Sequence, residues 1–149
     1  MQRTLLLDML AQNELTCSFA LNRITAENSR LRLTETSASV GFIYRHLAET
    51  MLLFGTFFGI PTNVQNTTMG RTDEGAVYDL AESHQLLADG YAQFRKLVET
   101  TPDDAWLQPI DTPFFGTVSW GRLFGHVLFH NAHHTGQIAM ALAHGTELR

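Results

Sequence analysis

The sequence predicts an all-α protein that folds as a four-helix bundle. Four long segments repeat apolar residues every three or four positions, which is the period of an amphipathic helix. The connectors between them are polar or contain Gly and Pro, and strand signals are few. The chain has 149 residues, 44% of them hydrophobic, which suits one domain over residues 1–149 with a sizeable core. Helices of this kind bury their apolar faces against one another, so a bundle is the expected architecture.

Apolar periodicity places the first two helices. The first is predicted over about residues 4–26, and a polar connector follows over residues 27–36. The second is predicted over about residues 37–59. Ser37 is its expected N-cap, because a serine hydroxyl can accept a hydrogen bond from a free N–H group of the first turn. Pro61 ends this helix.

A long polar loop is expected over residues 61–75, and loops of this length often serve function. The third helix is predicted over about residues 76–100, followed by a short helix over about residues 101–107. Residues 109–118 are expected to be irregular, with a tight turn at residues 115–117.

The fourth helix is predicted over about residues 119–144. Ser119 is its expected N-cap, and Gly145 follows its last turn. The long second connector and the irregular stretch before this helix allow a crossover topology, although spacing alone does not fix the order of the helices.

Composition excludes several classes of function. Ten basic and 15 acidic residues give a formal net charge of −5 and no basic run, so a nucleic-acid binder is not expected. No apolar run reaches the ~20 residues of a membrane span. Cys17 is the only cysteine, which excludes an internal disulfide and a multi-cysteine zinc site. The cytoplasm is the expected compartment.

Four of the seven histidines fall between residues 126 and 134. His130 and His134 are one helical turn apart and lie on the apolar face, between Val127 and Ile138. Two imidazoles in an apolar core need polar partners, and a divalent cation would satisfy both. A tight site needs a third ligand from another helix, and His46, at the border of the second helix's buried face, is the best candidate by position.

The alternative is that these histidines are ordinary polar residues of a helix, since a lone buried histidine is usually hydrogen-bonded within the core. His126, His130, His133 and Gln137 also form a polar strip at helical spacing. Spacing therefore leaves open whether His130 pairs with His126, His133 or His134.

Two motifs resemble those of a known family. Residues 130–138 resemble the C-terminal signature of the DinB/YfiT-like superfamily of metal-dependent bundles. In that signature a histidine, three residues and a second histidine are followed by a basic or small residue and Gly-Gln. Residues 39–49 resemble its second-helix motif, in which a histidine precedes a small residue and an acid. The resemblance implies a four-helix bundle with a crossover, commonly a homodimer.

The resemblance also implies His46, His130 and His134 as ligands of a divalent metal ion. Zinc, nickel and ferrous iron all suit nitrogen ligands. Three protein ligands leave a position open, as in catalytic sites, and the family's uses of such a site include hydrolysis and the transfer of a low-molecular-weight thiol. Thr135 stands where the family often has arginine, so an anion contact at that position is not expected here.

Five further residues are candidates around the metal. Glu49 and His133 are candidate catalytic groups, although an exposed helical glutamate and a surface histidine are the simpler interpretations. His126, Gln137 and His84 are candidates to orient a ligand or to line the pocket.

Three functions remain open from the sequence. The first is a metal-dependent transferase or hydrolase that acts on a small molecule, with thiol transfer ranked ahead of hydrolysis. The second is a non-catalytic metal- or ligand-binding bundle of a stress response. The third is a bundle without metal that binds a partner through Phe54, Phe57 and Phe58.

Overall fold

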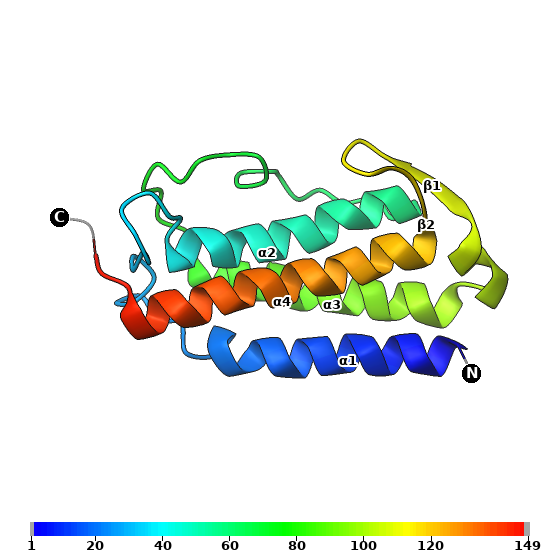
Figure 1. The fold of residues 1–149 in the computed structure, drawn as a ribbon, viewed down its shortest axis with the longest axis horizontal. Coiled ribbons are helices and arrows are strands. Elements are labelled where there is room, and N and C mark those ends of the chain that lie inside the picture. Colours follow the sequence, from blue (N-terminus) through cyan, green and yellow to red (C-terminus); the bar gives the residue numbers. More distant parts are fainter. Residues whose placement is uncertain (1, 148–149) are drawn as a thin grey trace.

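The protein is a four-helix bundle, as the sequence predicts, and it carries a small hairpin at one end (Figure 1). The computed structural model describes residues 2–147. The long helices are α1 (Gln2–Leu21), α2 (Val40–Gly55), α3 (Leu80–Thr100) and α4 (Trp120–His144). The shorter elements are the 3-10 helices η1 (Thr56–Phe58) and η2 (Asp103–Leu107) and the strands β1 (Pro109–Thr112) and β2 (Gly116–Ser119).

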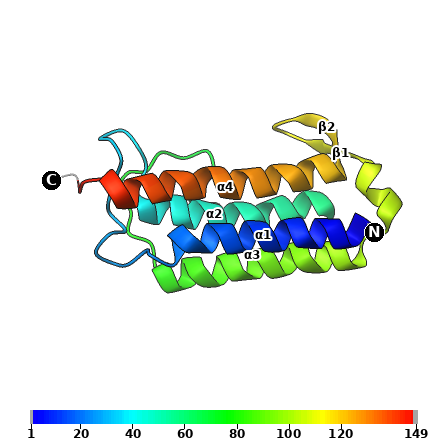
Figure 2. The same ribbon diagram turned by 60° about the horizontal axis from the view of Figure 1, so that its bottom comes forward.

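The helices are connected by a crossover. After α2 and η1 the chain runs back along the bundle, so that α3 starts at the same end as α2 and the two helices run parallel (Figure 1). α4 then returns antiparallel to α2 and packs beside both α2 and α1, while α3 packs against α1 and α2 (Figure 2). The crossover segment, residues 59–79, runs along the outer side of α2 (Figure 1). Its first part borders α2 and α3, and residues 68–71 lie by the side where α2 and α4 meet.

Side-chain caps decide where the helices begin. The Ser119 hydroxyl accepts a hydrogen bond from the Arg122 amide, as predicted for α4. α2 is capped by Ser39 and not by Ser37, because Ser37 is engaged in a local turn with Thr34. α3 begins four residues later than predicted, because the Asp79 carboxylate caps it by accepting from the amides of the next turn.

The prediction of irregular structure over residues 109–118 was wrong. β1 and β2 form an antiparallel hairpin, with Ile110 paired to Val118 and Thr112 paired to Gly116. Gly116 closes the turn with a left-handed φ of 64°, a conformation that glycine adopts without steric cost. Strands of four residues are too short for apolar alternation to show in the sequence.

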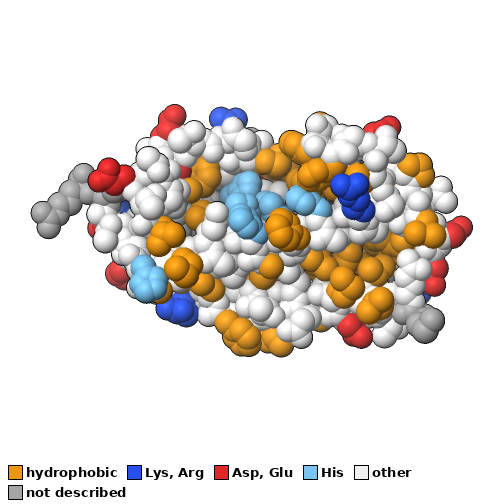
Figure 3. Space-filling model, in the orientation of Figure 1, with side chains coloured by type: hydrophobic (Ala, Val, Ile, Leu, Met, Phe, Trp, Pro, Cys, Tyr) orange, Lys and Arg blue, Asp and Glu red, His pale blue; other side chains and the backbone are white. Residues whose placement is uncertain are grey.

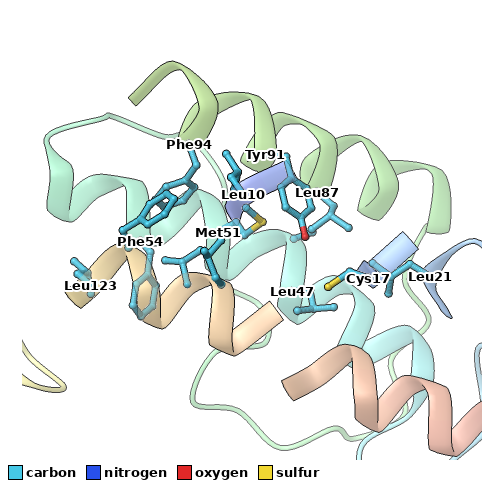
Figure 4. Close-up of a cluster of buried hydrophobic side chains, with 14 of the residues drawn as sticks. Leu10, Cys17, Leu21, Leu47, Met51, Phe54, Leu87, Tyr91, Phe94 and Leu123 are labelled. Carbon is cyan, nitrogen blue, oxygen red and sulfur yellow. The ribbon is translucent and has the colours of Figure 1, made fainter. Parts of the chain in front are cut away.

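The core lies between the four helices, where Leu10 of α1, Met51 of α2 and Tyr91 of α3 meet (Figure 4). Gly90 lets α2 and α3 approach closely, because a Cβ there would lie 2.8 Å from the Met51 Cβ. Phe54 and Phe58 belong to this core and Phe57 packs against it. Phe54 and Phe58 are therefore not available to a partner, whereas Phe57 is only partly buried.

Candidate metal centre

Three histidine side chains meet where α2 and α4 pack side by side. His46 comes from α2, and His130 and His134 come from successive turns of α4. Each offers a ring nitrogen, and these nitrogens lie within 4.8 Å of one another. The Nε2 atoms of His46 and His130 are 3.0 Å apart. Figure 3 shows a group of histidine side chains near the middle of one face of the molecule, with hydrophobic side chains on both sides.

The apolar pattern of α4 positions this cluster at the edge of the core. Val127 and Ile138 are buried, so the α4 face that carries His130 and His134 is turned toward α2. The three rings are half-buried, with one side against the bundle and the other toward solvent. Spacing left open whether His130 pairs with His126, His133 or His134. In the structure His134 is the one that shares a group of ring nitrogens with His130 and His46.

Burial makes these imidazoles unusually hard to protonate. It lowers the pKa of His130 to about 3, with repulsion from His134 and His46 adding to the effect. Burial and then His134 lower the pKa of His46 to about 4. The pKa of His134 is also lowered, chiefly by burial. The three rings are therefore neutral at physiological pH, which is the state that binds metal.

Neighbouring oxygens can fix the orientation of two of the rings. Nδ1 of His134 lies 2.6 Å from Oε1 of Gln137, one turn further along α4. Nδ1 of His46 lies 3.4 Å from the hydroxyl of Thr50. With the proton on Nδ1, each ring donates to that oxygen and keeps its Nε2 lone pair for a metal, which is how metal-binding histidines are commonly oriented.

The cluster fits a divalent metal ion. Two nitrogens bound to one tetrahedral ion at ~2.0–2.1 Å lie roughly 3.3 Å apart, close to the 3.0 Å between His46 and His130. Neutral imidazoles suit zinc, nickel and ferrous iron. Among residues 2–147, no carboxylate or thiolate completes the group, so protein atoms would leave part of the coordination sphere open.

Comparison with known families agrees with this arrangement. A model of the DinB superfamily matches residues 10–138. The chain belongs to the DinB superfamily. The match includes His46 and the motif that begins at His130, so the resemblance noted in the sequence is confirmed. A search of curated proteins gave no match.

Solved structures share the fold of this DinB-superfamily chain. YfiT from Bacillus subtilis matches with a TM-score of 0.71 and 15% identity, covering 92% of this chain and 83% of YfiT. It is described as a probable metal-dependent hydrolase with an unusual four-helix bundle topology. A conserved protein from Enterococcus faecalis matches with a TM-score of 0.72 and 13% identity, covering 93% of this chain and 94% of that protein.

His126 lies beside the cluster, one turn before His130. Its ring centroid is 6.1 Å from that of His130, and the ring packs between Phe54 at 5.6 Å and Phe115 of the hairpin turn at 4.5 Å. Burial lowers the pKa of His126. This histidine forms an aromatic wall next to the candidate metal centre, together with Phe54 and Phe115.

The other two candidate histidines, His133 and His84, are not among the residues whose ring nitrogens form the group. His133 is exposed and stacks on Phe129, with ring centroids 5.9 Å apart, although its ring also borders His134. His84 of α3 is exposed, and its Nδ1 lies 3.1 Å from the Tyr44 hydroxyl. This contact joins α2 and α3, and His84 is not one of the residues of the cluster.

Glu49 has a role that the sequence did not reveal. It is 1% exposed, so the interpretation of an exposed helical glutamate was wrong. Its carboxylate accepts four hydrogen bonds from Thr67 and Thr68 of the crossover segment, two from amides and two from hydroxyls, at 2.6–3.1 Å. Both oxygens are engaged, so the contacts favour Glu49 as an anchor for this segment over a proton acceptor.

The lowered pKa values predict that the metal-free protein is weakened by mild acid. Between about pH 7 and about pH 5 the unfolded chain binds protons on histidines of pKa near 6.5 that the folded cluster does not bind. The free energy of unfolding therefore decreases as the pH is lowered from about 7 to about 5, by on the order of 2 kcal/mol after allowance for partial exposure of the rings. Urea denaturation across this range measures it. A His130→Gln variant should lose a large share of the dependence, and equal stability at both ends would contradict the cause given.

The Gln137 contact predicts a change in metal affinity without loss of the fold. Gln137 is exposed, so Gln137→Ala should leave the thermal unfolding of the metal-free protein almost unchanged. Without the oxygen that orients His134, we expect zinc affinity to fall by roughly 10- to 100-fold. Competition with a chelating dye measures the affinity. Gln137→Glu keeps an acceptor at this position, and an equal loss in both variants would argue against orientation as the cause.

Proposed function

We propose that this protein is a metal-dependent enzyme that acts on a small molecule, with hydrolysis as its first candidate reaction. The observation that supports the proposal is the open cluster of His46, His130 and His134 at the edge of a cavity. Three protein ligands with a free position are typical of catalytic metal sites, whereas structural sites fill every position with protein atoms. The description of YfiT as a probable metal-dependent hydrolase supports the same proposal.

The residues around the site would have distinct roles. The three histidines would hold the ion, and Gln137 and Thr50 would keep two of their rings oriented. The ion, when bound, would supply a Lewis acid that polarises a substrate oxygen or lowers the pKa of water. The aromatic wall at His126 would exclude bulk water from one side of the centre.

Transfer of a low-molecular-weight thiol is the other reaction that the family resemblance implies, and it would use the same open position. The two reactions are separated by an assay. Protein purified without an affinity tag is first analysed for bound metal and is then offered ester and amide substrates, and electrophiles with and without added thiols. Turnover that requires a thiol would assign transfer, and turnover without one would assign hydrolysis.

The absence of any metal would overturn the enzyme proposal. A bound ion with no exchangeable ligand would instead favour the non-catalytic binding protein. Exchange of a bound probe such as azide or fluoride, followed spectroscopically on cobalt-substituted protein, distinguishes these cases.

We also propose that the protein is a homodimer. Phe19 of α1 and Phe129 of α4 are 69% and 65% exposed, and these two helices pack side by side. Light scattering in solution checks the oligomeric state, and a monomer at micromolar concentration would contradict the proposed homodimer.

Within residues 2–147, no helix has the length and apolar character needed to cross a membrane.

A further inference from the structure

A cavity of about 360 Å³ opens beside the histidine cluster. His46 and His134 form one side of it, and apolar side chains that include Phe42 and Ile43 form another. Its volume is within the range of small-molecule sites. Two larger hollows, of about 560 and 800 Å³, lie elsewhere and contain no histidine of the cluster.

One charged side chain lines this cavity, that of Arg71. Within residues 2–147 its guanidinium makes no ion pair and no hydrogen bond. The nearest acidic residue along the chain, Asp73, does not neutralise it. The Asp73 side chain is 1% exposed and is held by Arg32 at 2.8 Å and by the Ser39 amide at 2.8 Å. Arg71 is therefore a free cation at the wall of an otherwise uncharged cavity.

The backbone that carries Arg71 is fastened on both sides. Before it, Thr67 and Thr68 are bound by the buried Glu49 carboxylate. After it, Asp73 is bound to Arg32 and to the start of α2. Between these anchors the chain turns at Gly70, whose φ is 74°, and the Arg71 amide donates to the Thr68 carbonyl at 3.1 Å. A cation on an anchored turn gives a ligand a defined position to bind.

We propose that this cavity binds small molecules that carry a carboxylate on a short apolar chain, with Arg71 binding the carboxylate. The proposal rests on the proposed function and names its substrate class, with the reacting group directed toward the histidines. A guanidinium matches a planar carboxylate with two parallel hydrogen bonds. Phosphate sites usually gather several charged donors, and here Arg71 is the one charged side chain in a wall that is mostly apolar. Thr135, where the family often has arginine, is buried beside the groove between α1 and α4 and does not line this cavity.

The test compares an acid with its neutral amide of the same shape. Pentanoate and pentanamide are titrated into the full-length metal-free protein at about pH 8, where the cluster imidazoles are neutral and Arg71 is the charged group of the cavity. Ligand-observed NMR gives both dissociation constants. We expect pentanoate to bind about tenfold or more tightly than pentanamide, because a hydrogen-bonded charge pair is worth more than a neutral contact.

Variants assign the preference to Arg71. It should fall to about twofold or less in Arg71→Gln, be partly kept in Arg71→Lys, and persist in Arg3→Gln, a matched loss of an exposed positive charge on α1. Pentanamide affinity should be the same in all four proteins. Equal binding of acid and amide to the wild type, no binding of either, or a preference that survives in Arg71→Gln would overturn the proposal. Tighter binding of butyl phosphate than of pentanoate would overturn the choice of carboxylate.

The same titrations on zinc-loaded protein keep the two proposals separate. Failure to take up zinc, with the carboxylate preference intact in the metal-free protein, would refute the metal centre and leave a carboxylate-binding cavity. Uptake of zinc without a carboxylate preference in the metal-free protein would refute the role of Arg71 and leave the metal centre in place.

Discussion

Replacing any one of His46, His130 or His134 with alanine should abolish stoichiometric binding of the metal. Each substitution leaves two imidazoles in a cluster where three ring nitrogens lie within 4.8 Å of one another. Loss of groups that only orient a ligand costs about 10- to 100-fold in affinity, so loss of a ligand itself should cost more than about 100-fold. Elemental analysis of untagged protein after gel filtration measures the bound metal, and chelator competition measures its affinity.

His133→Ala is the matched control for this experiment. His133 lies on the same helix, next to His134, but is exposed and outside the group of metal-binding atoms. It should bind metal as the wild type does. A second measurement compares the free energy of unfolding with and without zinc. Zinc at about 100 times its dissociation constant should stabilise the wild type by about 2.7 kcal/mol and should not stabilise the three ligand variants. Retention of stoichiometric metal by all three would refute the ligand assignment.

The part of the site that helical geometry alone predicts is the part within one helix. His130 and His134 are one turn apart, and the apolar residues on either side of them show which way they face. Their position relative to each other therefore follows from helical geometry alone. His46 was predicted as their partner from its position at the border of the second helix's buried face and from the family resemblance, and the packing of α2 beside α4 brings it to them.

The parts that the sequence does not predict depend on the crossover segment. Glu49 meets Thr67 and Thr68 across 18 and 19 residues, and no local pattern marks that pairing. Arg71 reaches the cavity because the same segment is tied down over α2. The helix starts show the same limit on a smaller scale, since Ser37 and Ser39 are equally good caps in sequence and only the turn at Thr34 decides between them.

Glu49→Ala should produce the largest loss of stability at the site. The substitution removes four hydrogen bonds to a carboxylate that is 1% exposed, and it leaves the buried Thr68 groups without their acceptor. We expect the free energy of unfolding to fall by about 3 kcal/mol, since buried donors left without a partner cost about 1–3 kcal/mol. Urea denaturation measures the loss. Hydrogen exchange should show the amides of Thr67 and Thr68 losing their protection.

Glu49→Gln separates anchoring from acid–base chemistry at this position. The amide oxygen can take the place of Oε2, which accepts three of the four hydrogen bonds, and the amide NH2 can donate to the Thr67 hydroxyl after that group rotates. We therefore expect this variant to lose about 1 kcal/mol and to keep the carboxylate preference of the cavity, whereas Glu49→Ala weakens that preference by releasing the backbone before Arg71. A glutamine variant that folds and binds pentanoate as the wild type does, yet has lost all turnover, would instead show that Glu49 acts as a proton acceptor.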